Sequence, residues 1–155
     1  MRKSNRPIYI STRICYTVIT KKRKIKGRTK GVKMVFKGIS KNFLLTDEQQ
    51  YDTIGAFWDE LSEIYGLENL QGLGYCWQGN QISYAIGLKK GDIPNQNVCV
   101  ELPDEGWVSV KGKTENLKAI YDEIYKQGRL QFEIETFSEN GDCEILYYRV
   151  PNPKA

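Results

Sequence analysis

The 155-residue chain contains no histidine. This absence excludes Ser-His-Asp and Cys-His nucleophilic catalysis, and it excludes every metal site that relies on an imidazole ligand. Any chemistry must therefore come from carboxylates, tyrosines, lysines or cysteines. We expect no cofactor and no metal, and we assign no catalytic residue from the sequence.

Cysteines are few and widely spaced. They are Cys15, Cys76, Cys99 and Cys143, and no two of them have the C-x-x-C spacing of a zinc cage or a redox pair. The amino terminus is basic, but residues 7–13 are too short and too polar for the apolar part of a secretory signal. We therefore expect a cytoplasmic protein in which all four cysteines stay reduced.

Long apolar runs are also missing. No stretch of about 18 apolar residues occurs, so the sequence predicts neither a transmembrane helix nor a membrane partner. A chain of this length has room for one compact domain. The sequence indicates no particular oligomeric state.

Acidic residues are absent from the first 33 positions. Residues 1–33 hold 12 Lys/Arg, which leaves 11 of the 23 basic residues against all 19 acidic ones in residues 34–155, a net charge of −8. We interpret residues 1–33 as a basic N-terminal arm and residues 34–155 as the folded domain. The arm is either a nucleic-acid contact or a flexible tail, and the tail is favoured because no aromatic platform accompanies the charges. The acidic body favours cationic ligands.

One apolar pattern occurs twice, 63 residues apart. Its members are spaced i, i+3, i+4 and i+7, which places them on one face of an α-helix. The repeat predicts two matching subdomains, and the seam between them is where we expect a small-molecule cleft. The two copies are Ile54, Phe57, Trp58 and Leu61, and then Leu117, Ile120, Tyr121 and Ile124.

Capping signals delimit the two repeated helices. Thr46 and Gln49 have the spacing of a capping box, which predicts a helix over residues 47–65. The second copy predicts a helix over residues 114–127, with Thr114 as its N-cap.

A Gly79-Asn80 turn between two alternating runs predicts a two-residue hairpin. This register places Tyr75 opposite Tyr84 and Trp77 opposite Ile82, so that large side chains gather on one face. A face of small side chains lets a ligand or a packed helix approach the sheet closely. The small face would carry Gly72, Gly74, Cys76, Ser83, Ala85 and Gly87.

Each half of the chain thus has the order strand, helix, strand, strand. The predicted fold class is α+β, a duplicated β-α-β-β module with an antiparallel sheet, two helices and pseudo-twofold symmetry.

A turn at Asn140-Gly141 predicts a hairpin near the end of the chain. A two-residue turn places Phe137 opposite Glu144, with Glu135 as a diagonal neighbour about 7–8 Å away. Two carboxylates beside aromatic rings suit an organic cation, or acid–base work if burial raises one pKa. A longer turn would shift the register by one residue and reverse every assignment. The residues on the shared face would be Glu133, Glu135, Phe137, Glu144, Leu146 and Tyr148.

Charge that alternates along a strand usually marks its solvent face, and this is the favoured interpretation for Glu133. The aromatic residues have two interpretations, core and pocket wall. Trp58 and Tyr121 hold equivalent helix positions that face the sheet, which favours the core. Trp107 precedes the second helix near the seam and is assigned to the pocket rim. The choice stays open for Tyr75, Trp77 and Tyr84.

Five short motifs follow one another along residues 34–150. They are Phe57-Trp58-Asp59-Glu60-Leu61, Leu73-Gly74-Tyr75-Cys76-Trp77, Ile82-Ser83-Tyr84-Ala85-Ile86-Gly87, Gly106-Trp107-Val108 and Ile134-Glu135-Thr136-Phe137. Their order and spacing resemble the GyrI-like small-molecule-binding domain, the effector-binding domain of bacterial AraC-type and MerR-type multidrug regulators.

The resemblance implies a duplicated β-α-β-β fold whose central cleft binds amphipathic, often cationic, compounds through aromatic side chains and a buried glutamate. Its Ile-Glu-x-aromatic segment makes Glu135 the candidate for that glutamate. Glu144 is the weaker assignment, because its segment is one residue longer than in the family and lacks the proline.

We therefore predict a stand-alone protein, without its own helix-turn-helix, that senses or sequesters a hydrophobic cation. One alternative is a hydrolase of reactive electrophilic compounds, in which Glu135 and a tyrosine activate water. Another is a macromolecular role, through nucleic acid at the basic arm or through inhibition of gyrase. The predicted ligand-binding residues are Glu135, Glu144, Trp77, Tyr84, Trp107, Tyr121 and Tyr148.

Overall fold

The structure is a computed structural model that describes residues 34–150. The predicted basic arm and Cys15 lie outside the described residues. A nucleic-acid contact through the arm therefore stays a prediction.

Seven strands and two α-helices make up the described part of the chain, with short 3-10 turns before and after the first helix and before the second. All strand pairs are antiparallel, which confirms the predicted fold class. The elements are β1 (Met34–Leu44), α2 (Gln49–Tyr65), β2 (Leu70–Gln78), β3 (Gln81–Leu88), β4 (Val98–Leu102), β5 (Val108–Lys113), α3 (Leu117–Lys126), β6 (Leu130–Phe137) and β7 (Asp142–Arg149).

The sheet has the strand order β4-β1-β3-β2-β6-β7-β5. The order β1-β3-β2 in the first half is repeated as β5-β7-β6 from the other edge, and β2 meets β6 at the centre. There Gly72 lies directly opposite Glu135, and these two residues are separated by the same 63 positions as the repeated helices. The pseudo-twofold axis therefore passes between Gly72 and Glu135, and β4 is an addition outside the repeat.

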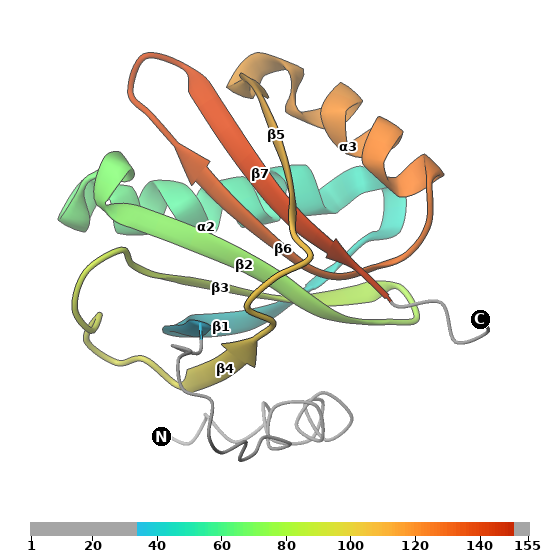
Figure 1. Cartoon of the computed structure of the whole chain (residues 1–155). Coiled ribbons are helices and arrows are strands. Elements are labelled where there is room, and N and C mark those ends of the chain that lie inside the picture. The colour runs from blue at the N-terminus through green and yellow to red at the C-terminus, as the bar shows by residue number, and fades with distance from the viewer. Residues whose placement is uncertain (1–33, 151–155) are drawn as a thin grey trace, which may run out of the picture.

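Both helices cover the same face of the sheet (Figure 1). Helix α2 packs Trp58 and Leu61 against Tyr84 and Ile86 of β3, and α3 packs Ile124 against β7. The helices are amphipathic as the repeated pattern predicts, and their apolar faces form two clusters, one in each repeat.

The opposite face of the sheet has its own apolar cluster, around Phe36, Leu73 and Phe132. Trp107 packs against this cluster, and its indole nitrogen donates to the carbonyl oxygen of Pro103 at 2.8 Å. Residues 103–107 connect β4 with β5, which lie at opposite edges of the sheet.

The predicted capping box is wrong. Thr46 begins a 3-10 turn and the α-helix begins at Gln49, with no side chain bonded to its first amides. Asp47 and Glu48 have positive φ angles of 53° and 60°, so the chain turns sharply and the Thr46 hydroxyl is not placed over the first helical turn. Thr114 likewise begins a 3-10 turn and caps no helix.

The first hairpin has the predicted turn but a different register along its strands. Gln78 pairs with Gln81 across Gly79-Asn80 as predicted. A bulge then follows at Cys76, whose φ is 57°, and it places Gly74 instead of Tyr75 opposite Tyr84. The prediction that large side chains share one face of the hairpin and small side chains the other is therefore wrong. A bulge shifts the register by one residue, so the residues before it point to the opposite face from the one predicted.

The second hairpin has a three-residue loop rather than a two-residue turn. The Ser138 amide donates to the Asp142 carbonyl at 2.9 Å, and Gly141 adopts a φ of 94°, as in a type I turn closed by a glycine bulge. Glu144 therefore pairs with Thr136 and lies on the opposite face of the sheet from Glu135. The predicted shared face is wrong for Glu144, Leu146 and Tyr148.

Two further findings concern residues 34–150. No helix within residues 34–150 is long and apolar enough to cross a membrane. Cys99 and Cys143 carry free thiols, but Cys76 is disulfide-bonded, so the expectation that all cysteines stay reduced is wrong for Cys76.

Candidate functional site

A cavity of about 420 Å³ lies at the seam between the two repeats. Its walls come from α2, α3, β3, β6 and the loop of the second hairpin. Aromatic side chains and buried carboxylates dominate the lining, and no Lys or Arg of the described residues contributes to it. The lining includes the side chains of Gln50, Tyr51, Trp58, Tyr84, Tyr121, Tyr125, Glu133, Glu135 and Phe137.

Glu135 is the best-connected carboxylate of the cavity. Its side chain is 5% exposed, and its two oxygens accept hydrogen bonds from the phenol of Tyr84 and, at 2.6 Å, from the phenol of Tyr121. The indole nitrogen of Trp58 donates to the Tyr84 oxygen at 2.9 Å. Because α2, α3 and β3 each contribute one side chain to this network, elements of both repeats fix the position of Glu135. Charge-assisted hydrogen bonds of this kind compensate for burying a carboxylate.

Glycines on β2 make room for the network. A Cβ atom on Gly72 would stand 2.2 Å from the Tyr84 phenol oxygen and 2.8 Å from the Trp58 ring. Gly74 makes room for the carboxylate of Glu133 in the same way, since a Cβ atom on Gly74 would stand 2.8 Å from Oε2 of Glu133. The small residues of β2 therefore let the cavity side chains lie flat against the sheet.

We expect Gly72→Ala to destabilise the protein by about 1–3 kcal/mol, because the added methyl group must displace the buried Tyr84. Denaturant unfolding measures this loss. Gly55→Ala is the control, since Gly55 lies within α2 and a Cβ there meets nothing within 4 Å. That change should leave stability equal or higher by up to about 1 kcal/mol. Equal stability of Gly72→Ala and the wild type would contradict the packing described for Tyr84.

Glu133 is a second buried carboxylate of the cavity. Its side chain is 4% exposed and accepts one hydrogen bond, from the Tyr125 phenol at 3.0 Å. The favoured interpretation of Glu133 as a solvent-facing residue is therefore wrong. Glu133 and Glu135 alternate along β6 and face Gly74 and Gly72 of β2. Paired glycines with the same two-residue spacing were the sequence signal that could have identified Glu133.

Burial changes the acid–base properties of both carboxylates. Burial raises the pKa of Glu133 well above its ordinary value, and the nearby charge of Glu135 raises it further. Burial also raises the pKa of Glu135, but the hydrogen bonds from Tyr121 and Tyr84 oppose this rise. Because Glu135 accepts two phenol hydrogen bonds and Glu133 only one, we expect Glu133 to take up a proton before Glu135 does.

The phenols stay protonated at neutral pH. Burial raises the pKa of Tyr84 and of Tyr121 well above the ordinary value, and the neighbouring carboxylates add to the rise. Both phenols are therefore permanent hydrogen-bond donors to Glu135. At the mouth of the cavity the exposed Asp59 and Glu139 add further negative charge.

Three of the predicted ligand-binding residues lie together in the cavity, namely Glu135, Tyr84 and Tyr121. Trp58, which the sequence favoured as a core residue, is 6% exposed and also lines the cavity. Trp77 packs beside the apolar cluster of α3 but does not line the cavity.

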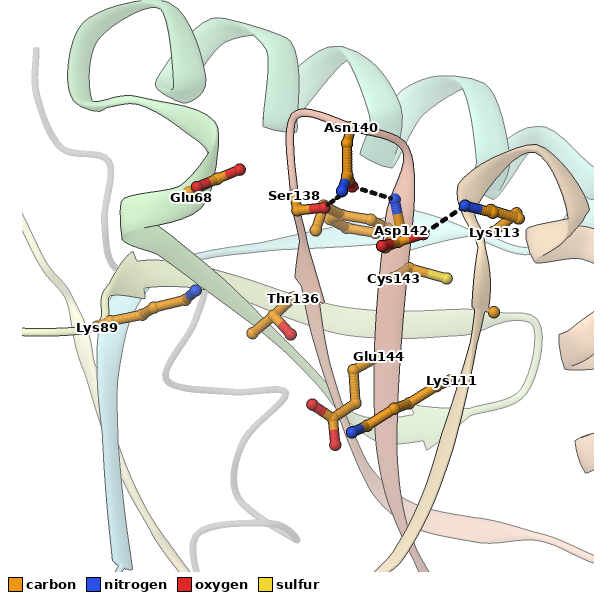
Figure 2. Close-up of a pocket in the computed structure, with 12 residues that line it drawn as sticks. Glu68, Lys89, Lys111, Lys113, Thr136, Ser138, Asn140, Asp142, Cys143 and Glu144 are labelled. Carbon is orange, nitrogen blue, oxygen red and sulfur yellow. Dashed lines mark hydrogen bonds and ion pairs between the residues drawn. The ribbon is translucent and has the colours of Figure 1, made fainter.

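The remaining candidates lie on the other face of the sheet. The rings of Trp107 and Tyr148 pack together, with centroids 5.7 Å apart, against the apolar cluster there. Glu144 accepts a hydrogen bond from the Ser109 hydroxyl at 2.8 Å and lies beside Lys111 (Figure 2). The one-residue shift of the second hairpin accounts for the positions of Glu144 and Tyr148.

A second, more open cavity of about 710 Å³ lies where β5 and β6 end and β7 begins (Figure 2). Its charges are mixed: Lys89, Lys111 and Lys113 alternate with three carboxylates, and Lys113 pairs with Asp142 at 2.7 Å. A mixed and exposed surface of this kind favours neither cations nor anions.

Comparison with known proteins supports the fold. No family model and no curated protein matches the chain. Among solved structures, SAV2435 bound to tetraphenylphosphonium is similar, with a TM-score of 0.50 over 76% of this chain and 93% of that chain. The two proteins share a fold. Their sequences are 14% identical, so the likeness concerns the fold and not the residues of the site.

Proposed function

We propose that this protein binds amphipathic organic cations in the cavity between its repeats, as a sensor or a sequestering protein. The observation that carries the proposal is the buried Glu135, held by two phenols in an aromatic cavity that no basic residue of the described chain lines. A negative charge in such surroundings attracts a cation more strongly than it would in water.

The cavity suits a ligand that is both apolar and positively charged. Ring faces attract cations, and Trp58, Tyr121 and Phe137 provide such surfaces around Glu135. A volume of about 420 Å³ lies in the range of small-molecule sites. The GyrI-like resemblance of the sequence implies the same ligand class, and SAV2435, which shares the fold, was solved with tetraphenylphosphonium.

A pair of ligands with equal shape and opposite charge tests the proposal. Tetraphenylphosphonium and tetraphenylborate carry the same four phenyl groups around a central atom, so that apolar burial is matched. Isothermal calorimetry with the wild-type protein should show saturable binding of the cation and little or no binding of the anion. Equal affinity for both ions would mean that the cavity selects for shape alone, and the proposal would then be wrong.

A second candidate function is hydrolysis of reactive electrophilic compounds. The arrangement that favours it is a buried carboxylate held by two phenols, because burial raises the pKa of Glu135 and such a carboxylate can take a proton from an attacking water. Recovery of an electrophile as its hydrolysis product, in a reaction that Glu135→Gln abolishes, would favour this function over simple binding.

A further inference from the structure

Glu133 has hydrogen-bonding capacity that the described residues leave unused. It accepts one hydrogen bond, whereas Glu135 accepts two, although both side chains are buried to the same degree. The two carboxylates lie on one face of β6, with their Cα atoms roughly 7 Å apart, because each residue of a strand advances about 3.3 Å. A ligand with a single positive charge can neutralise one of them but not both.

A third acceptor lies in the same cavity. The side-chain oxygen of Gln50 is buried and accepts no hydrogen bond from the described residues, and Gln50 is one of the residues that line the cavity. A buried acceptor without a donor is costly, and native proteins rarely leave one without a partner. The described lining offers this oxygen no Lys or Arg, so a bound molecule with an N–H group can supply the donor.

We propose that the cavity contains a second cation subsite at Glu133, and that its preferred ligands are aromatic dications with N–H donors, such as primary diammonium or bis-amidinium compounds. The inference rests on the proposed function, since it assigns Glu135 to the first cationic group. The second group then pairs with Glu133, which accepts only one hydrogen bond from the described residues and can accept N–H donors from the ligand. A quaternary ammonium group neutralises the charge but has no N–H to donate.

A proton occupies Glu133 when no dication is bound. Two carboxylates in one buried site do not both ionise easily, and Glu133, with fewer hydrogen bonds, is the one that holds the proton. A single cation bound at Glu135 leaves this proton in place. A dication replaces it, so binding of a dication at neutral pH should release about one proton more than binding of the matching monocation.

Two ligands on one scaffold test the subsite: 1,4-bis(aminomethyl)naphthalene, a dication at neutral pH, and 1-(aminomethyl)naphthalene, its monocation. Calorimetry should give the dication about tenfold or higher affinity for the wild-type protein. In Glu133→Gln the advantage should fall to about the twofold statistical factor of a symmetric ligand, while affinity for the monocation changes little. Glu144→Gln, on the opposite face of the sheet, is the control and should keep the full advantage.

Proton release provides a readout on the wild-type protein that does not depend on the folding of a variant. Titrations in two buffers of different ionisation enthalpy give the number of protons released by each ligand. A dication advantage near twofold in the wild type, or an advantage that Glu133→Gln keeps, would overturn the subsite, as would equal proton release by both ligands. If tetraphenylphosphonium still binds in that case, the proposed function stands and only the second subsite falls. If neither tetraphenylphosphonium nor the monocation binds, both proposals fall.

Discussion

Glu135→Gln is expected to lower the affinity for tetraphenylphosphonium by about 30- to 150-fold, which corresponds to about 2–3 kcal/mol. The substitution keeps the size of the side chain and removes its charge. A cation that enters the cavity loses its water, and Glu135 is the carboxylate whose two phenol donors stabilise the charged form. Without that charge, the aromatic walls alone must compensate for the lost hydration.

Calorimetric titration of the wild type and the variant measures the effect directly. Glu144→Gln is the matched control, since it makes the same chemical change one strand away and on the opposite face of the sheet. It should leave the affinity unchanged within about twofold, because a partly exposed carboxylate is screened by water. Equal losses in both variants would show that general negative charge, and not the buried Glu135, attracts the ligand.

The affinity for tetraphenylphosphonium is also expected to rise with pH and then level off. This ligand has a permanent charge, so any pH dependence comes from the protein. Burial raises the pKa of both cavity carboxylates above the ordinary value of 4.5. Protonation of Glu135 removes the counter-charge, so below its raised pKa the affinity should fall by up to about tenfold for each pH unit.

Titrations between pH 5 and pH 8 test this dependence. The sign follows from linkage: a cation stabilises the ionised form, so binding lowers the pKa of the carboxylate and releases a proton wherever the free protein still holds one. The slope should therefore extend to pH values above 4.5 and be absent in Glu135→Gln. An affinity that stays constant from pH 5 to pH 8 would mean that Glu135 is fully ionised throughout, contrary to the effect of its burial.

The architecture was predictable because it depends on patterns that repeat along the chain. The helix pattern of Trp58 and Tyr121 recurs at a fixed distance, and alternating apolar residues define strands whatever their exact pairing. Turn residues located both hairpins. The register within the hairpins was not predictable, because one residue decides it: a bulge at Cys76 in the first hairpin and a third loop residue before Gly141 in the second.

The same one-residue shifts determine how much of the site could be predicted. Glu135 precedes the loop of the second hairpin, and its position depends on the pairing of β6 with β2. Glu144 follows the loop, so an error in the turn moved it to the wrong face. Glu133 was missed because a carboxylate two residues from another on a strand usually faces water, and its burial depends on the space that Gly74 leaves in a different repeat.

The meeting of Gly72 and Glu135 at the pseudo-twofold axis has a consequence for stoichiometry. Equivalent positions of an ancestral duplication would carry identical residues, and two facing glutamates would repel each other while two glycines would offer no charge. Here one copy supplies the carboxylate, and the glycine of the other leaves the space in which the Tyr84 phenol lies and donates to it. The difference at this one residue pair makes the two halves of the proposed site unequal, and we expect one ligand per polypeptide rather than two.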